Sequence, residues 1–231
     1  MRLLLVAADP MEFRGILAHA EEVRPMEAAV DWIRSGRLGA HEAVFAVNGV
    51  GRKRAAAAVD AVVPRWKPDA VVSTGFCGAL EDGLDIGDVV VGTEVVSPQG
   101  SWRAAPVEAA ASFRTGAVSS IDHVAATAGE KRELRQTGAS VVEMEAAGVA
   151  ARAESFGIPF QCVRVVTDLA DETMANDFNS ALRPDGHFAT MHILLGALRQ
   201  PTIRLPELLR LRSRCVRAAR GLGDFIVNCR F

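Results

Sequence analysis

Cysteine is scarce in this sequence, and the few cysteines present form no ligand or disulfide pattern. Cys77, Cys162, Cys215 and Cys229 are scattered without a CxxC pair, and no histidine lies at metal-ligand spacing. This distribution predicts buried free thiols in a reducing cytoplasm and no metal site. A chain of 231 residues buries most of the surface that it exposes when unfolded. A small scaffold held together by disulfides is therefore excluded.

Long apolar runs and an excess of charge of one sign are also absent. No stretch of about 18 apolar residues occurs, so no transmembrane helix is expected. Asp9, Pro10 and Glu12 interrupt the apolar N-terminus before any cleavage site, which predicts a first strand and not a signal peptide. Lys and Arg number 26 against 28 Asp and Glu. The chain thus has no overall positive field that would indicate a nucleic-acid partner.

Apolar runs bounded by turn residues alternate with alanine-rich segments of helical period, which predicts an α/β layered domain. We expect strands at 3–8, 43–48, 70–74, 88–96, 116–119, 141–142 and 160–167, and helices at 10–20, 52–63, 130–137 and 145–156. Pro64 is expected to end the second helix, and GFCGAL is expected to form a turn after residue 74. No repeat or linker occurs, so residues 1–231 are predicted to form one domain, with 188–231 as a helical C-terminal extension.

The C-terminal extension is basic and amphipathic. Eight arginines stand against two acidic residues from Arg199 to the end, and Pro201 and Pro206 are expected to interrupt the helical pattern. The segment Leu205–Val227 can gather its apolar residues on one side and its arginines on the flanks. These residues are Leu205, Leu208, Leu209, Val216, Leu222 and Ile226, with Arg204, Arg210, Arg214 and Arg217. Two interpretations stay open, a helix packed on the α/β core and a helix that lies on an anionic membrane.

Two glycine-bearing segments, NGVGR and TGFCGAL, follow predicted strands. Backbone N–H groups in such segments often contact a phosphate, a ribose or a carboxylate. Neither segment matches the dinucleotide fingerprint GxGxxG, because Arg54 stands where the third glycine belongs. For Gly75 and Gly78 a structural turn and a ligand contact are equally compatible with the sequence.

Acidic residues recur at the ends of predicted strands. Glu143 and Glu145 flank Met144 in the otherwise apolar segment VVEMEAAGVA, and the strand VRVVTD ends in Thr167 and Asp168. Acids in a first helical turn also interact well with the helix dipole, and Asp168 could simply cap a turn. Ligands in α/β sheets bind at the carboxyl ends of strands, however, so these side chains are candidate acids or bases. Glu12, just after the first strand, alone would read as an exposed first-turn glutamate.

Taken together, these segments resemble the superfamily of purine nucleoside phosphorylases and methylthioadenosine/S-adenosylhomocysteine nucleosidases, and its nucleosidase branch most. The resemblance covers residues 1 to about 175 and is carried in order by Glu12, NGVGRKRAAAA, KPDAVVSTGFCGAL, IGDVVVGTEVV, VVEMEAAGVA and IPFQCVRVVTDLAD. It implies a three-layer α/β/α fold with a mixed central sheet, a homodimer and no cofactor. The part after residue 175 resembles the hopanoid-associated members, which release adenine from adenosylhopane.

The resemblance also implies a role for each site residue. Asp168 would protonate N7 of the purine, Glu145 would hold the ribose 2′- and 3′-hydroxyls, and Glu12 would deprotonate the attacking water. His123 would lie over the base, and the segment from Thr74 to Gly78 would line the sugar. The implied substrate-binding set is Glu145, Met144, Glu143, Thr74, Gly75, Phe76, Gly78, His123 and Thr167.

Carboxylates suit this chemistry on independent grounds. Cleavage of an N-glycosidic bond needs a protonated leaving base and a stabilised cationic sugar. One buried carboxyl can hold a proton while its ionised neighbours stabilise the positive charge. The predicted function is hydrolytic release of adenine from a 5′-substituted adenosine. Phosphorolysis, for which Arg14 and Arg52 could supply cations, and a non-catalytic nucleoside-binding protein at a membrane are the alternatives.

Overall fold

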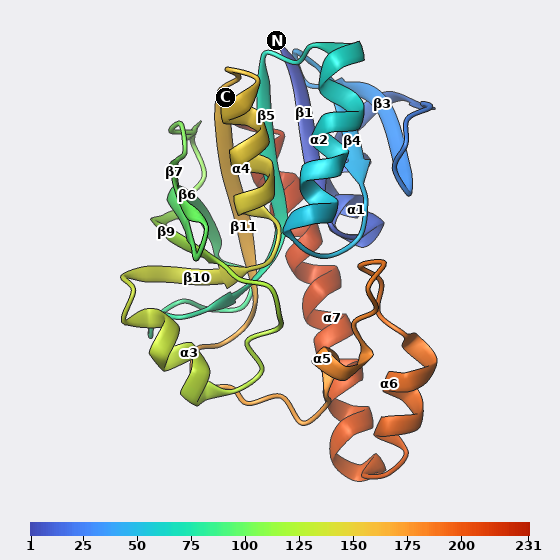
Figure 1. Cartoon of the computed structure of the whole chain (residues 1–231), viewed down its shortest axis with the longest axis vertical. Helices are drawn as coiled ribbons and strands as arrows, with labels where there is room; N and C mark the ends of the chain where they lie inside the picture. Colours follow the sequence, from blue (N-terminus) through green and yellow to red (C-terminus); the bar gives the residue numbers. More distant parts are fainter.

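A mixed β-sheet forms the middle layer of the protein, and helices cover both of its faces (Figure 1). The computed structural model describes residues 1–231. The strands are β1 (Arg2–Ala7), β2 (Ala20–Pro25), β3 (Trp32–Leu38), β4 (His41–Val47), β5 (Ala70–Ala79), β6 (Val89–Ser97), β7 (Gly100–Arg103), β8 (Glu108–Ala109), β9 (Arg114–Ser120), β10 (Ala139–Glu143), β11 (Phe160–Asp168) and β12 (Cys229–Arg230). The three-layer α/β/α fold predicted from the sequence is confirmed.

The sheet runs in the order β10-β9-β6-β11-β5-β1-β4-β3-β2. Strand β1 is parallel to β4 and β5, and β5 is parallel to β11, so these strands end at the same edge. Strand β10 pairs with both β9 and the end of β5. The strands β5, β11, β6, β9 and β10 therefore close into a ring, which brings the carboxyl ends of β10 and β11 beside that of β5.

Helices α2 (Arg52–Trp66) and α4 (Ala146–Ser155) cover one face of the sheet. The short helix η1 (Pro10–Phe13), helix α1 (Arg14–His19) and the C-terminal half of α7 (Pro201–Ile226) cover the other. Each face has its own apolar core, of 26 and 21 buried residues respectively. Helices α3 (Ala128–Arg135), α5 (Phe178–Ala181) and α6 (Thr190–Ala197) lie outside these layers (Figure 1).

The strands predicted from apolar runs are present, but the predicted ends of one helix and one strand are wrong. Helix α2 continues through Pro64 to Trp66 and ends where Lys67 adopts a left-handed conformation with its N–H bonded to the Val63 carbonyl. A proline one turn before a helix end removes a single hydrogen bond, and the helix tolerates that loss. The segment GFCGAL forms no turn, because β5 continues through Ala79 and pairs with both β11 and β10.

Helix α7 divides into two parts with different surroundings. Its C-terminal half packs Leu222 and Ile226 into the core, as the packing interpretation requires. Pro206 does not interrupt the helix, since Thr202, whose carbonyl loses its partner, is exposed to water. The N-terminal half extends past the sheet together with α6 (Figure 1). Neither α7 nor any other helix combines the length and apolarity needed to cross a membrane.

Candidate active site

The predicted acidic residues meet where β1, β5, β10 and β11 end. Glu12 follows β1 on η1, Glu143 ends β10, Glu145 precedes α4, and Asp168 ends β11. All four side chains are at least nine-tenths buried by residue, and all four line one cavity of about 340 Å³. The shared edge of the parallel strands thus gathers side chains that lie more than 150 residues apart in the chain.

Three backbone N–H groups hold the Glu12 carboxylate. Its Oε2 accepts hydrogen bonds from Ala8 and Asp9 at 2.8 and 2.9 Å, and its Oε1 accepts one from Phe76 at 2.7 Å. Burial nevertheless raises the pKa of Glu12, while these N–H groups oppose the shift. The result is a carboxyl group held in one position, with a raised proton affinity.

Gly75 leaves the space that Glu12 occupies. A Cβ at this position would lie 2.2 Å from Glu12 Oε1, and the glycine has a φ of +141°, which few other residues adopt. Gly78 has a similar role, since its Cβ would lie 2.7 Å from Asp168 Oδ2. Both glycines therefore lie within strand β5 and make room for carboxylates. This role differs from the structural turn and from the ligand contact, the two interpretations that the sequence left open.

We expect the Gly75→Ala variant to lose about 10²-fold in activity, because the added methyl group displaces the Glu12 carboxylate by an ångström or more. The measurement is the steady-state rate on a nucleoside substrate. Gly221→Ala is the matched control, since nothing lies within 4 Å of its added Cβ. Equal rates for the two variants would show that the position of Glu12 does not matter.

Arg164 joins two of the carboxylates. Its Nη2 lies 2.5 Å from Glu143 Oε2, and its Nη1 lies 3.6 Å from Glu145 Oε2. The guanidinium is fully buried and also donates to the Ser73 hydroxyl at 2.5 Å. Glu143 Oε2 accepts further hydrogen bonds from the backbone N–H groups of Glu145 and Ala146. Glu143 therefore makes the closer ion pair with Arg164, and Glu145 has an oxygen available to other hydrogen-bond donors.

The pKa of Glu145 is strongly perturbed. Burial and the neighbouring Glu143 carboxylate raise its pKa to about 8, against the opposing effect of Arg164. Its Oε1 accepts a hydrogen bond from the Gly51 N–H at 2.9 Å, which ties α4 to the loop before α2. From the sequence Glu145 is expected to be ionised; burial and the charge of Glu143 favour its protonated form, and Arg164 favours its ionised form.

Asp168 is paired with a buried lysine that the sequence analysis did not select. Lys131, fully buried on α3, contacts Asp168 Oδ2 with its Nζ and donates to the Leu169 carbonyl at 2.7 Å. The Thr167 hydroxyl donates to Asp168 Oδ1 at 3.2 Å. Burial raises the pKa of Asp168, and Lys131 opposes the rise. Asp168 can hold a proton because it is buried, and Lys131 limits how firmly it does so.

Most of the remaining predicted residues line the same cavity. Phe76, Gly78, Met144, Thr167 and His123 are on its wall, whereas Thr74 and Gly75 are buried outside the lining. The imidazole of His123 is 47% exposed and lies 2.8 Å from Asp122 and 2.5 Å from Glu130. The hydrogen bond to Asp122 raises the pKa of His123. An imidazole at the rim thus accompanies the acidic floor.

The C-terminal segment supplies an apolar wall that the sequence analysis did not foresee. Five residues from the segment after β11 face the carboxylates across the cavity, namely Met174, Phe178, Phe188, Ile193 and Leu211. The apolar character of these residues was visible in the sequence, but their position opposite β5 and β10 depends on where α5, α6 and α7 lie.

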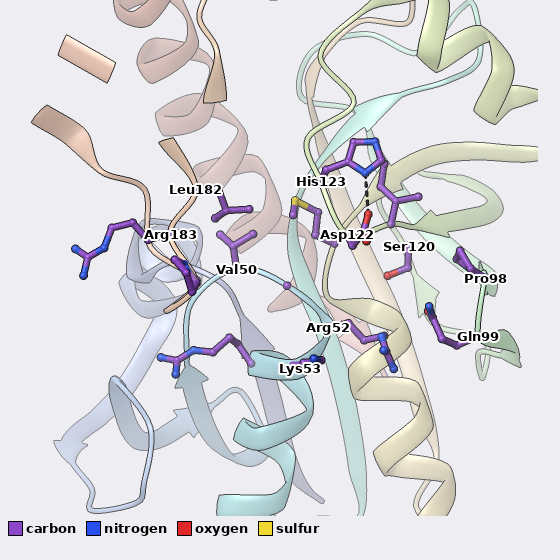
Figure 2. A pocket seen from close by; sticks show the side chains of 16 residues that line it. Val50, Arg52, Lys53, Pro98, Gln99, Ser120, Asp122, His123, Leu182 and Arg183 are labelled. Carbon is purple, nitrogen blue, oxygen red and sulfur yellow. Dashed lines mark hydrogen bonds and ion pairs between the residues drawn. The ribbon is translucent and has the colours of Figure 1, made fainter. Parts of the chain in front are cut away.

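A second cavity of about 440 Å³ adjoins the first and shares Val50, His123 and Met144 with it. Figure 2 shows this cavity with Arg52, Lys53 and Arg183 around it and the hydrogen bond between His123 and Asp122. It contains none of the buried acids. The buried acids therefore line only the smaller of the two cavities.

The chain matches a known class of protein. The family model described as the phosphorylase superfamily matches residues 2–112 and 102–185, and the chain belongs to this superfamily. The resemblance of the sequence motifs to this superfamily is thereby confirmed, while the resemblance of the part after residue 175 to hopanoid-associated members stays a prediction.

Individual relatives are nucleosidases. The 5′-methylthioadenosine/S-adenosylhomocysteine nucleosidase of Shewanella piezotolerans is 28% identical over 199 residues, which are 73% of this chain and 86% of that protein. The Campylobacter jejuni enzyme of the same name has a similar structure, with a TM-score of 0.73, 16% identity and coverage of 98% and 97% of the two chains. The futalosine hydrolase of Helicobacter pylori is similar too, with a TM-score of 0.73, 16% identity and coverage of 98% and 95%.

Proposed function

We propose that this protein is an N-glycosidase that hydrolyses a 5′-substituted adenosine and releases adenine. The observation that carries the proposal is the convergence of Glu12, Glu145 and Asp168 in one buried cavity with an apolar opposite wall. The nucleosidase names of the relatives support the same reaction. Two carboxyl groups with separate tasks and a third for the sugar are what this reaction needs.

Asp168 is the general acid in this proposal. When it holds a proton, it delivers that proton to N7 of the purine, so that adenine leaves as a neutral base. The sugar then carries positive charge in the transition state. Thr167 fixes one oxygen of Asp168 by donating to it, and Gly78 leaves space for the other. The acid is therefore oriented before the substrate binds.

Glu145 and Glu12 act on the sugar side. Glu145 binds the ribose 2′- and 3′-hydroxyls, and Met144 packs against the sugar ring. Glu12 orients a water molecule and accepts its proton as the water attacks the anomeric carbon. The negative charge shared by this carboxylate cluster stabilises the developing cation electrostatically. Glu143, Phe76 and His123 complete the binding site.

The buried arginine favours water over phosphate as the nucleophile. Both terminal nitrogens of Arg164 are engaged with Glu143, Glu145 and the 73–74 segment, so they offer no free fork to a phosphate. Arg14 is exposed on α1, and Arg52 lies in the second cavity. Several buried carboxylates would also repel a phosphate dianion. These contacts support hydrolysis over phosphorolysis.

The apolar wall bears on the 5′ substituent. Aromatic and aliphatic side chains such as Phe178, Phe188 and Ile193 suit an apolar group at this position, of the methylthio or adenosylhopane type. The proposal predicts that methylthioadenosine and a 5′-alkyl adenosine yield free adenine faster than unsubstituted adenosine. Adenine release from the three nucleosides, together with S-adenosylhomocysteine, is the measurement. If all four nucleosides bind without releasing adenine, the protein is a nucleoside-binding protein and not an enzyme.

Removal of Lys131 is expected to shift the pH dependence of the reaction. Adenine release needs protonated Asp168, so the rate falls as the pH rises through the pKa of that acid. Lys131 holds this pKa down, and the Lys131→Met variant therefore loses activity at a higher pH than the wild type. The measurement is the pH profile of kcat/KM, with the exposed neighbour Arg132→Met as control. If the alkaline limb of the pH profile of Lys131→Met stayed in place or moved to lower pH, Lys131 would not be the group that lowers the pKa of Asp168.

We also propose a location, a domain organisation and an oligomeric state for the enzyme. It acts on a small-molecule nucleoside in the cytoplasm, as one domain spanning residues 1–231, and it forms a homodimer. The residues after 188 form its helical extension, which α7 anchors through Leu222 and Ile226. Contact with a membrane is peripheral and involves this extension.

A further inference from the structure

The exposed apolar side chains of the protein are concentrated in one place. Of nine large hydrophobic residues that are exposed, six lie between residues 191 and 209. They are Met191, Leu194, Leu195, Leu198, Ile203 and Leu209, with exposed fractions from 44% to 68%. Single exposed apolar residues are ordinary, but a concentration of them in one segment indicates an interaction surface.

These residues lie on the hairpin of α6 and the N-terminal half of α7, here called the helical tip (residues 190–212). The tip extends beyond the α/β layers, and no strand of the sheet lies beneath it (Figure 1). Its two helices are joined by a hydrogen bond of 2.9 Å from Arg204 Nη1 to the Gly196 carbonyl. The apolar side chains are thus presented on an ordered projection that the core of the protein does not cover.

The helical tip is also basic. Arg199, Arg210 and Arg212 are exposed, and none of them makes an ion pair. The one acid of the tip, Glu207, is held by the backbone N–H groups of Ala175 and Asn176. The free charge around the apolar residues is therefore positive.

We propose that the helical tip docks on the surface of an anionic lipid membrane. Aliphatic side chains surrounded by unpaired arginines are the combination with which interfacial helices bind such a surface. The apolar chains enter the boundary of the acyl region, while the arginines contact the lipid phosphates. Because no helix of the chain can span a bilayer, the contact is peripheral.

Other occupants fit the helical tip less well. A second copy of the chain would bring its own unpaired arginines against Arg199, Arg210 and Arg212, and like charges at an interface are unfavourable. The centre of a protein interface is enriched in aromatic residues, whereas the exposed apolar residues of the tip are all Leu, Ile or Met. A projection with flexible aliphatic chains suits a fluid surface better than a shaped partner.

The helical tip is continuous with the apolar wall of the active-site cavity. Ile193 lines the cavity from α6 next to exposed Leu194, and Leu211 lines it from α7 between exposed Arg210 and Arg212. Docking therefore places the apolar side of the cavity close to the lipid. If the proposed function holds, an adenosine whose 5′ group is embedded in the bilayer can reach the acids without leaving the membrane entirely.

Vesicle sedimentation tests the docking surface without using the reaction. The purified full-length protein is mixed with vesicles of phosphatidylcholine and phosphatidylglycerol, or of phosphatidylcholine alone, at low and high salt. We expect binding to the anionic vesicles that weakens with salt. The triple variant Arg199→Gln, Arg210→Gln, Arg212→Gln is expected to bind on the order of a hundredfold more weakly. Its matched control removes three exposed arginines elsewhere, with Arg24→Gln, Arg103→Gln and Arg114→Gln, and keeps its binding.

A separate variant tests the contribution of the apolar side chains to vesicle binding. Leu195→Ser with Leu198→Ser is expected to abolish vesicle binding, whereas Val23→Ser with Phe156→Ser, which removes exposed apolar groups elsewhere, is not. Thermal unfolding of each variant establishes that it folds. Lack of binding by the wild type, or equal loss in tip and control variants, overturns the proposal. Concentration-dependent self-association through Leu195 without vesicle binding overturns it in favour of a second copy. Because no substrate is present, failure of the proposed function leaves this result unaffected.

Discussion

Replacement of Asp168 by asparagine is expected to lower adenine release by about 10²- to 10⁴-fold. The amide has the shape of the carboxyl group but delivers no proton to the leaving base. Its oxygen can still accept from Lys131, so the side chain keeps its buried partner and the fold is retained. The measurement is single-turnover adenine release, which isolates the chemical step from product release.

Asp171→Asn is the matched control for this variant. Asp171 is three residues further along the chain and exposed, so the same chemical change there leaves the rate near that of the wild type. If Asp168→Asn released adenine at a near-normal rate, another group would have to be the acid. The His123 imidazole, at the rim of the same cavity, would then be the first candidate.

Replacement of Glu12 by glutamine is expected to impair the reaction to a similar extent, about 10²- to 10⁴-fold. The amide cannot accept the proton of the attacking water. In addition, three backbone N–H groups point at the carboxylate oxygens, and the NH₂ group of glutamine would face at least one of these donors. The substitution therefore lowers the reaction rate and also disturbs the position of the side chain.

The kinetic constants separate Glu12 from a residue that only binds substrate. We expect kcat to fall while KM changes little, because Glu12 acts on the water and not on the nucleoside. Glu27→Gln, at an exposed glutamate, controls for the loss of one charge. A higher KM with an unchanged kcat would assign Glu12 to substrate binding and leave the base unidentified.

The position of the acids could be predicted from the sequence because two regular patterns meet there. Continuous apolar runs identified β1, β10 and β11 as buried strands, and the carboxyl ends of such strands are where α/β sheets handle ligands. Glu12, Glu145 and Asp168 each follow one of these runs. Their convergence then depends only on the strands being neighbours, which the family resemblance implied.

The cations that partner the acids were harder to predict. Arg164 had a signal that was not used, since a lone arginine in the apolar run CVRVVTD is buried and needs acidic partners. Lys131 had none, because the segment GEKRELRQ has the composition of a solvated helix. Its burial results from the packing of α3 against β10 and from the contact of Lys131 with Asp168 at the end of β11, tertiary contacts that no local pattern encodes.

The parts of the fold that the sequence analysis did not predict are those with weak hydrophobic periodicity. Strand β2 is largely exposed and β3 is mostly half-buried, and both contain many polar residues, so these strands give no alternating or continuous apolar signal. The first helix was expected to reach Ala20, where β2 begins instead. Strand β5 continues through GFCGAL because Gly75 and Gly78 make space for Glu12 and Asp168, a reason that involves residues far away in the chain.

Product analysis with and without phosphate tests the central claim most directly. The enzyme is incubated with methylthioadenosine in phosphate-free buffer and in buffer with added phosphate, and both the base and the sugar product are identified. The arrangement of Glu12, Glu145, Asp168 and the committed Arg164 predicts free adenine and the free 5-substituted ribose at the same rate in both buffers. A sugar 1-phosphate that forms only when phosphate is added would contradict hydrolysis and assign the site to phosphorolysis.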